Sequence, residues 1–214
     1  MGRSPASWIK FTRSLWGPVL TGVCYYIAAA IALDFSHGKD GIATVWPSSG
    51  ILLAALLISH RGSRVWHLCA AAIASLSVNL NLGNGWWISF GFTIANIGES
   101  WLAAWLISRQ VGRQISFSDP LRLLNFCIAA FMATSASASI ATTVVPVGTA
   151  TFWFSWFSTD LLGILLVTPL IMIAERAISN SGIRKSTRAT AEVVGIFALV
   201  ATVCSLTFAH TKAR

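Results

Sequence analysis

The sequence has few charged residues and no polar stretch long enough to form a soluble domain. Only 10% of the 214 residues are charged, whereas 55% are hydrophobic and the mean hydropathy is +0.71. The longest polar stretches, 34–41, 108–119 and 175–192, are too short and too poor in apolar residues to bury a core of their own. This composition excludes an ordinary soluble protein and predicts an integral membrane protein.

The sequence also lacks motifs for catalysis, metal binding and redox chemistry. It contains no G-G-D-E-F motif, no H-box and no nucleotide-binding loop, and no His lies well inside an apolar run to act as a general base. The four Cys residues lie in four different apolar runs, and no two His residues have the helical spacing of metal ligands. We therefore expect no enzyme activity, no metal and no cofactor.

The hydrophobic residues are concentrated in seven runs. A helix needs roughly 17 to 25 apolar residues to cross a membrane, and the runs lie at about 15–33, 42–58, 65–82, 86–107, 121–145, 152–174 and 193–209. They predict an all-α, polytopic transmembrane helix bundle of about seven spans, forming a single domain over residues 1–214. A re-entrant segment is the alternative for the run at 42–58, which contains Pro47 and Gly50.

The basic residues are distributed unevenly between the loops, which predicts the orientation. With seven spans and the N-terminus in the cytoplasm, every Lys and Arg except Lys39, Lys212 and Arg214 falls on the cytoplasmic side. If the run at 42–58 were re-entrant, the Lys and Arg residues would be divided less unevenly between the two sides of the membrane. We therefore interpret this run as a crossing. The net charge of +8 then comes from short loops beside helix ends, where basic residues meet anionic lipid headgroups. No nucleic-acid partner is expected.

Two acidic residues, Glu99 and Asp160, lie inside apolar runs that contain no Lys or Arg to pair with them. An ionised group in hydrocarbon costs roughly 2.5 kcal/mol or more. Asn96 precedes Glu99 by one helical turn and shares its face. Two interpretations stay open: neutral acids that close hydrogen bonds between helices, and a polar pocket for a ligand. At about 1.5 Å per residue, Glu99 lies about 20 Å and Asp160 about 12 Å below the outer helix ends, so we expect different depths.

Tryptophan is abundant, and most of the 10 Trp residues lie near predicted span ends. Interfacial belts account for most of them. The alternative is a ligand pocket built from the outer set, Trp46, Trp86, Trp87, Trp153 and Trp156. Small residues from Ala133 to Thr143 favour close helix packing over a polar conduction path.

Three segments together resemble a known family. They are Trp46-Pro47-Ser48-Ser49-Gly50 followed by ILLAALL, then Asn96 and Glu99 ahead of LAAWL, and then DLLGIL from Asp160 with Pro169-Leu170. In this order, over nearly the whole chain, they are similar to the membrane-associated sensor domain family, first type (MASE). The residues of this sequence that match the family pattern are Trp46, Pro47, Gly50, Asn96, Glu99, Asp160, Gly163 and Pro169.

The resemblance implies a sensory module of the bacterial inner membrane, usually at the N-terminus of histidine kinases and of proteins that make or degrade cyclic di-GMP. The resemblance implies an eight-span bundle whose chain ends in the cytoplasm. The seven runs of this sequence instead place Arg214 outside. We therefore expect a truncated module without its last helix and output domain.

The expected partners are the lipid bilayer and a small ligand or a membrane protein. A homodimer stays open.

We predict that the signal is perceived by Asn96, Glu99, Asp160, Trp46 and Trp156, with structural roles for Pro47, Gly50, Gly163 and Pro169. The alternative function is a small secondary transporter that uses Glu99 and Asp160 as coupling-ion sites. Transporters contain internal repeats, and the segment Gly50-Ile-Leu-Leu is matched by Gly163-Ile-Leu-Leu. No flanking similarity extends this match.

Overall fold

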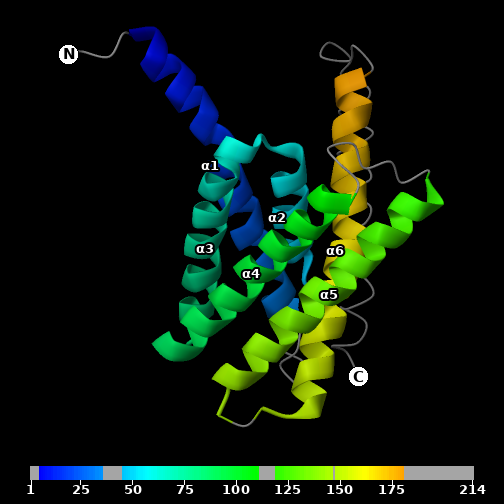
Figure 1. Cartoon of the computed structure of the whole chain (residues 1–214). Coiled ribbons are helices and arrows are strands. Elements are labelled where there is room, and N and C mark those ends of the chain that lie inside the picture. Colours follow the sequence, from blue (N-terminus) through cyan, green and yellow to red (C-terminus); the bar gives the residue numbers. More distant parts are fainter. Residues whose placement is uncertain (1–4, 36–44, 111–118, 147, 181–214) are drawn as a thin grey trace.

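The computed structural model describes residues 5–35, 45–110, 119–146 and 148–180, and every regular element within these ranges is a helix (Figure 1). The elements are α1 (Pro5–Phe35), α2 (Pro47–Ile58), the 3-10 turn η1 (Arg61–Ser63), α3 (Arg64–Asn81), α4 (Trp86–Gln110), α5 (Pro120–Val144) and α6 (Ala150–Asn180). The all-α prediction is confirmed.

Proline, aspartate and glycine mark several helix boundaries. Pro47 and Pro120 occupy the first turns of α2 and α5, where a backbone N–H has no partner within the helix. The Asp119 carboxylate accepts a hydrogen bond of 3.0 Å from the backbone N–H of Leu121 and so caps α5. Gly83 turns the chain between α3 and α4 at a φ of 82°, which favours glycine. These boundaries follow from local chemistry.

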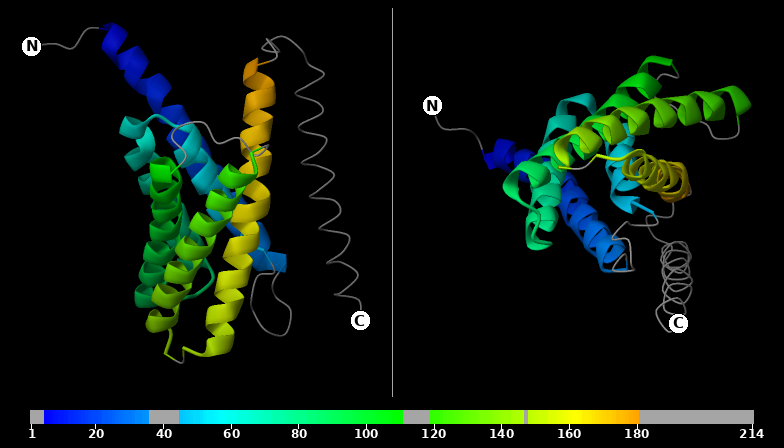
Figure 2. Two further views of the ribbon diagram at one scale, coloured as in Figure 1. Left: turned by 45° about the vertical axis from the view of Figure 1, so that its right-hand side comes forward. Right: turned by 90° about the horizontal axis from the view of Figure 1, so that it is seen from below.

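The short helix α2 lies in the centre of the bundle. α1, α3, α4 and α6 all pack against it, while α5 packs against α4 and α6 (Figure 2). Most of α2 is buried, and Leu52 and Leu53 have no exposed surface. The position of α2 therefore determines how most of the other helices meet.

Polar side chains are buried in this bundle, whereas many large apolar side chains face outward. The buried polar residues include Asn96, Glu99 and Asp160. Large apolar side chains are exposed on α1, α3, α5 and α6, for example Leu20, Ile73, Phe131 and Leu166. An extensive apolar surface is unfavourable in water but is the expected exterior of a bundle in lipid.

Among the described residues, three helical segments are long and apolar enough to cross a membrane: Trp16–Asp34, Pro120–Val144 and Ala150–Arg176. The predicted runs at 65–82 and 86–107 form α3 and α4, which do not meet this criterion. α2 has 12 residues and is about 18 Å long, less than the roughly 30 Å of bilayer hydrocarbon. Seven spans are therefore not confirmed, and the run at 193–209 lies outside the described residues.

Several arginines lie at one end of the bundle, which we call the basic end. Arg61 lies between α2 and α3, Arg64 begins α3, Arg109 is in the last turn of α4, Arg122 is in the first turn of α5, and Arg176 lies near the end of α6. These helix ends are on the side to which the N-terminal part of α1 points, at the top of Figure 1. The α3–α4 and α5–α6 connections lie at the opposite end.

The small residues of α5 belong to the packed interior. Ala133, Ala138 and Ala141 have no exposed surface, and α4 and α6 pack against this helix. Gly91 of α4 lies so close to Val144 of α5 that a Cβ at position 91 would overlap the valine side chain. Close helix packing thus accounts for this run of small residues.

Candidate functional site

The start of α2 is held against α6 by close backbone contacts. The backbone N–H of Trp46 donates a hydrogen bond of 3.0 Å to the carbonyl of Thr159. A Cβ on Gly163 would overlap the carbonyl oxygen of Trp46, and a Cβ on Gly50 would overlap that of Gly163. Because only glycine lacks a Cβ, both positions require it for this approach. Gly50 and Gly163 therefore meet at one helix crossing.

The two helices run in the same direction through this crossing. Beyond Gly163, the hydroxyl of Thr168 donates a hydrogen bond of 3.1 Å to the Gly50 carbonyl. The matched segments at 50–53 and 163–166 therefore meet at their glycines, and Gly50 is level with the part of α6 that follows Gly163. Pro169, which cannot donate a backbone hydrogen bond, follows inside α6, and Pro47 begins α2.

Glu99 of α4 and Asp160 of α6 lie next to each other in the bundle interior. Their exposed fractions are 1% and 2%, and their carboxyl groups are close enough to interact electrostatically, although no hydrogen bond of good geometry joins them. The prediction that they lie at different depths is wrong. α4 is inclined relative to α6 (Figure 1), so residues counted from each helix start do not measure depth along one common axis.

Several polar atoms around the two acids lack a hydrogen bond of good geometry. Within the described part of the chain, no partner is found for either carboxylate oxygen of Glu99, for Oδ2 of Asp160, or for the side-chain amide of Asn96. Ser49 and Ser137 lie near Glu99, but no basic side chain in these ranges pairs with either acid. Buried polar groups nearly always have partners. The arrangement therefore fits a site that meets polar groups from elsewhere.

Two aromatic side chains contribute further polar atoms. The hydroxyl of Tyr25 in α1 and Nε1 of Trp46 are buried, and neither has a hydrogen-bond partner of good geometry in the described ranges. The two residues lie near each other and near Ser75 of α3. We define the buried polar cluster as Tyr25, Trp46, Ser49, Asn96, Glu99 and Asp160.

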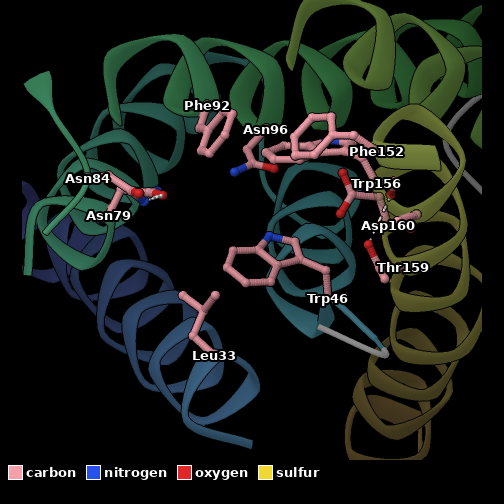
Figure 3. A pocket seen from close by; sticks show the side chains of 11 residues that line it. Leu33, Trp46, Asn79, Asn84, Phe92, Asn96, Phe152, Trp156, Thr159 and Asp160 are labelled. Atoms are coloured by element: carbon pink, nitrogen blue, oxygen red, sulfur yellow. Dashed lines mark hydrogen bonds between the residues drawn. The ribbon is translucent and has the colours of Figure 1, made fainter. Parts of the chain in front are cut away.

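A cavity of about 200 Å³ adjoins this cluster (Figure 3). Asn96 and Asp160 contribute to its polar surface, and the indole nitrogen of Trp46 points toward Asn96. The lining residues are Leu33, Trp46, Asn79, Asn84, Phe92, Asn96, Phe152, Ser155, Trp156, Thr159 and Asp160. They come from the ends of α1 and α3, the α3–α4 connection, the first half of α4, the residue before α2 and the start of α6. The cavity is thus closer to the end of the bundle opposite the basic end.

The aromatic wall of the cavity is held in place by ring contacts and a hydrogen bond. The ring centroids of Phe92 and Trp156 are 4.7 Å apart, and those of Phe152 and Trp156 are 5.8 Å apart. Nε1–H of Trp156 donates a hydrogen bond of 3.0 Å to the Ser137 hydroxyl on α5. A fixed indole presents a defined π-surface to the cavity.

The structure brings all five predicted sensing residues together. Trp46, Asn96, Trp156 and Asp160 line the cavity, and Glu99 adjoins Asp160 without lining the cavity itself. One sensing site is predicted for these residues, but their spacing along the chain does not show how α4, α6 and the start of α2 meet.

The other tryptophans of the predicted outer set do not line the cavity. Trp86 and Trp87 have exposed fractions of 72% and 74%, as expected for residues at a membrane interface. Trp153 stacks on Phe157 with ring centroids 5.2 Å apart, and its Nε1–H donates to Ser139 at 3.1 Å. The predicted five-tryptophan pocket thus reduces to Trp46 and Trp156.

Several residues of the site were missed at the level of sequence. Tyr25 offered a signal, because a tyrosine in the middle of an apolar run needs a partner for its hydroxyl. Ser49 lies within the Trp-Pro-Ser-Ser-Gly motif but is not among the predicted sensing residues. Nothing in the sequence distinguishes Phe92 and Phe152 from aromatic residues that face lipid.

Comparison with known protein families gives one match. The sequence profile of the MASE1 family matches residues 18–213, which include the buried polar cluster and both glycines of the helix crossing. The match confirms the resemblance that the three sequence segments indicated. Searches of curated proteins and of solved structures give no match.

Proposed function

The chain belongs to the MASE1 family of membrane-associated sensory domains of signalling proteins, and we propose that it is the signal-input module of a bacterial signalling protein. The observation that supports this role best is the cavity of about 200 Å³ beside buried polar atoms that no described residue satisfies. A site of this kind suits recognition. The signal in this proposal is a small ligand or a membrane partner, and the recipient is a cytoplasmic output domain.

In this proposal residues 1–214 form a single domain of the bacterial inner membrane with a cytoplasmic N-terminus. The arginines at the basic end support this orientation through the positive-inside rule. The cavity then lies toward the outer side of the membrane. The proposed topology keeps the seven crossings, and a homodimer is the proposed assembly.

α6 is the proposed route from the site to the output. It carries Trp156 and Asp160 at the cavity, contacts α2 at Gly163, and continues to the basic end. A ligand that binds one arrangement of α6 more tightly than another shifts the population toward that arrangement. The displacement is then available at the cytoplasmic end of α6.

The test is to substitute the two acids in the complete signalling protein that carries this domain. Glu99→Gln and Asp160→Asn preserve side-chain shape, and Asp119→Asn is a matched control because Asn also caps helices and residue 119 does not line the cavity. We expect the first two variants to change signal-dependent output and the control to leave it unchanged. Wild-type output from folded Glu99→Gln and Asp160→Asn proteins would show that this site is not used.

A secondary transporter is the second candidate function. The observation in its favour is that α2 and α6 run in parallel where the glycines of the matched segments 50–53 and 163–166 meet, next to a buried pair of acids. Uptake of a panel of solutes into proteoliposomes, compared between the wild type, Asp160→Asn and Asp119→Asn, distinguishes the two functions. Solute accumulation that requires Asp160 supports transport.

A further inference from the structure

We propose that the cavity binds a small organic cation with N–H donors, such as a protonated primary amine, with its charge against Asp160. This inference rests on the proposed sensory function and specifies the class of its ligand. Three properties of the site support it: its uncompensated acids, its aromatic wall and its unpaired hydrogen-bond acceptors.

The acids determine the sign of the ligand's charge. Glu99 and Asp160 are almost fully buried beside each other, and no basic side chain in the described ranges pairs with them. A cationic ligand offsets the cost of keeping carboxylate charge in the interior, whereas an anionic ligand adds repulsion. A neutral ligand leaves Asp160 without a counter-charge. The site therefore selects for positive charge.

The aromatic side chains strengthen the same preference. Trp46 and Trp156 line the cavity together with Phe92 and Phe152. The faces of aromatic rings attract cations, and tryptophan does so most strongly. Aromatic walls combined with a buried carboxylate therefore favour an organic cation over a strongly hydrated metal ion. In the described part of the chain, no group of three or more His, Cys, Asp or Glu side chains is arranged to hold a metal.

The unpaired acceptors distinguish a protonated amine from a quaternary ammonium ion. Oδ2 of Asp160 and Oδ1 of Asn96 are buried acceptors on cavity-lining residues, and neither has a donor among the described residues. A primary ammonium group has three N–H donors, whereas a quaternary ammonium group has none. Of these two groups, only the protonated amine can donate hydrogen bonds to the two oxygens.

The volume sets the size of the ligand. A cavity of about 150 Å³ is known to hold benzene, and this cavity measures about 200 Å³. One ring plus an aminomethyl group matches that space. Benzylamine is therefore a suitable probe, with benzyl alcohol as a neutral analogue and benzoate as an anionic one.

The experiment is calorimetric titration of the full chain in lipid nanodiscs at neutral pH, where benzylamine is protonated. We expect benzylamine to bind at least tenfold more tightly than benzyl alcohol, and benzoate to bind most weakly. Asp160→Asn should abolish the difference between amine and alcohol. Trp156→Phe should weaken amine binding several-fold, because phenylalanine attracts cations less strongly.

Matched controls are available on the same chain. Asp119→Asn makes the same change at an exposed helix cap. Trp153→Phe removes an indole of α6 that also donates a hydrogen bond to a serine of α5 but does not line the cavity. Both should retain wild-type affinity for benzylamine. The comparison of the three probes on the wild type needs no substitution, so it remains decisive if Asp160→Asn does not fold.

The ligand class is wrong if the folded protein binds benzylamine and benzyl alcohol equally, if folded Asp160→Asn keeps the preference for the amine, or if benzylamine does not bind. These outcomes are separable from failure of the sensory function. If the acid variants still change signalling while the probes fail, only the ligand class is overturned. If folded acid variants signal normally, the sensory site is overturned regardless of probe binding.

Discussion

The carboxyl group of Glu99 on α4 adjoins that of Asp160 on α6 in the bundle interior, and in the described ranges no basic side chain pairs with either. Two adjacent buried acids are an unusual structural element, because each loses its hydration and the two repel each other when both are ionised. Their retention in the interior therefore calls for a role beyond packing. The arrangement also makes specific predictions about stability.

Replacing one acid by its amide should not destabilise the domain. Glu99→Gln removes the repulsion and one of the two desolvation costs, so we expect the free energy of unfolding to rise by about 1 kcal/mol or to stay unchanged. The double variant with Asp160→Asn should deviate from additivity by roughly 0.5–3 kcal/mol, because the two groups are in contact. Unfolding in detergent micelles measures both values. Lower stability of both single variants would contradict the prediction.

The glycine crossing predicts a large difference between two otherwise similar substitutions. Gly163→Ala places a methyl group on the carbonyl oxygen of Trp46 and should lower the free energy of unfolding by about 1–3 kcal/mol. Gly98→Ala meets no atom within 4 Å and should be neutral or stabilising, by up to about 1 kcal/mol through helix propensity. Thermal unfolding in detergent compares the two. Equal stabilities would show that the contact is not tight.

A buried histidine should stabilise the contact between α1 and α3. Nδ1 of His67 lies 2.9 Å from the Thr21 hydroxyl, and Nε2 lies 2.9 Å from the Ser59 hydroxyl. Because Thr21 donates its proton to the Gly17 carbonyl, it accepts from Nδ1–H, and Ser59 then donates to Nε2.

Loss of this bridge should be costly in the same unfolding assay. We expect His67→Ala to lower the free energy of unfolding by about 1–3 kcal/mol, because two hydrogen bonds are lost. His60→Ala, at an exposed turn, should change it by no more than about 0.5 kcal/mol. Comparable losses in both variants would mean that the bridge contributes little.

The proposed orientation predicts which turns a membrane-impermeant thiol reagent reaches. In a chain whose native Cys residues are replaced by Ala, Gly85→Cys lies in the α3–α4 connection and Gly62→Cys in the turn before α3. Both glycines have room for a side chain. Spheroplasts should label position 85 directly and position 62 only after permeabilisation. The reverse pattern would invert the topology, and labelling of both would show that α3 does not cross.

The acids could be selected from sequence because an ionisable group in an apolar run is costly wherever it lies. The contact between the two acids could not be predicted, because residue counts measure depth only along each helix separately and α4 is inclined relative to α6. Gly50 and Gly163 were likewise assigned structural roles, but nothing in the sequence indicated that the two residues meet. Tyr25 joins the same cluster from a helix that carried no predicted site residue.

Composition, run length and short motifs establish a helical membrane protein of the MASE1 family, because these local properties are the same for any arrangement of the helices. Which faces of the helices turn inward depends on the tertiary structure. In lipid the hydrophobic effect does not orient an apolar helix, so the inward face is chosen by glycine contacts and by the polar groups that gather away from the hydrocarbon. That choice brought Glu99 and Asp160 together and placed a cavity beside them.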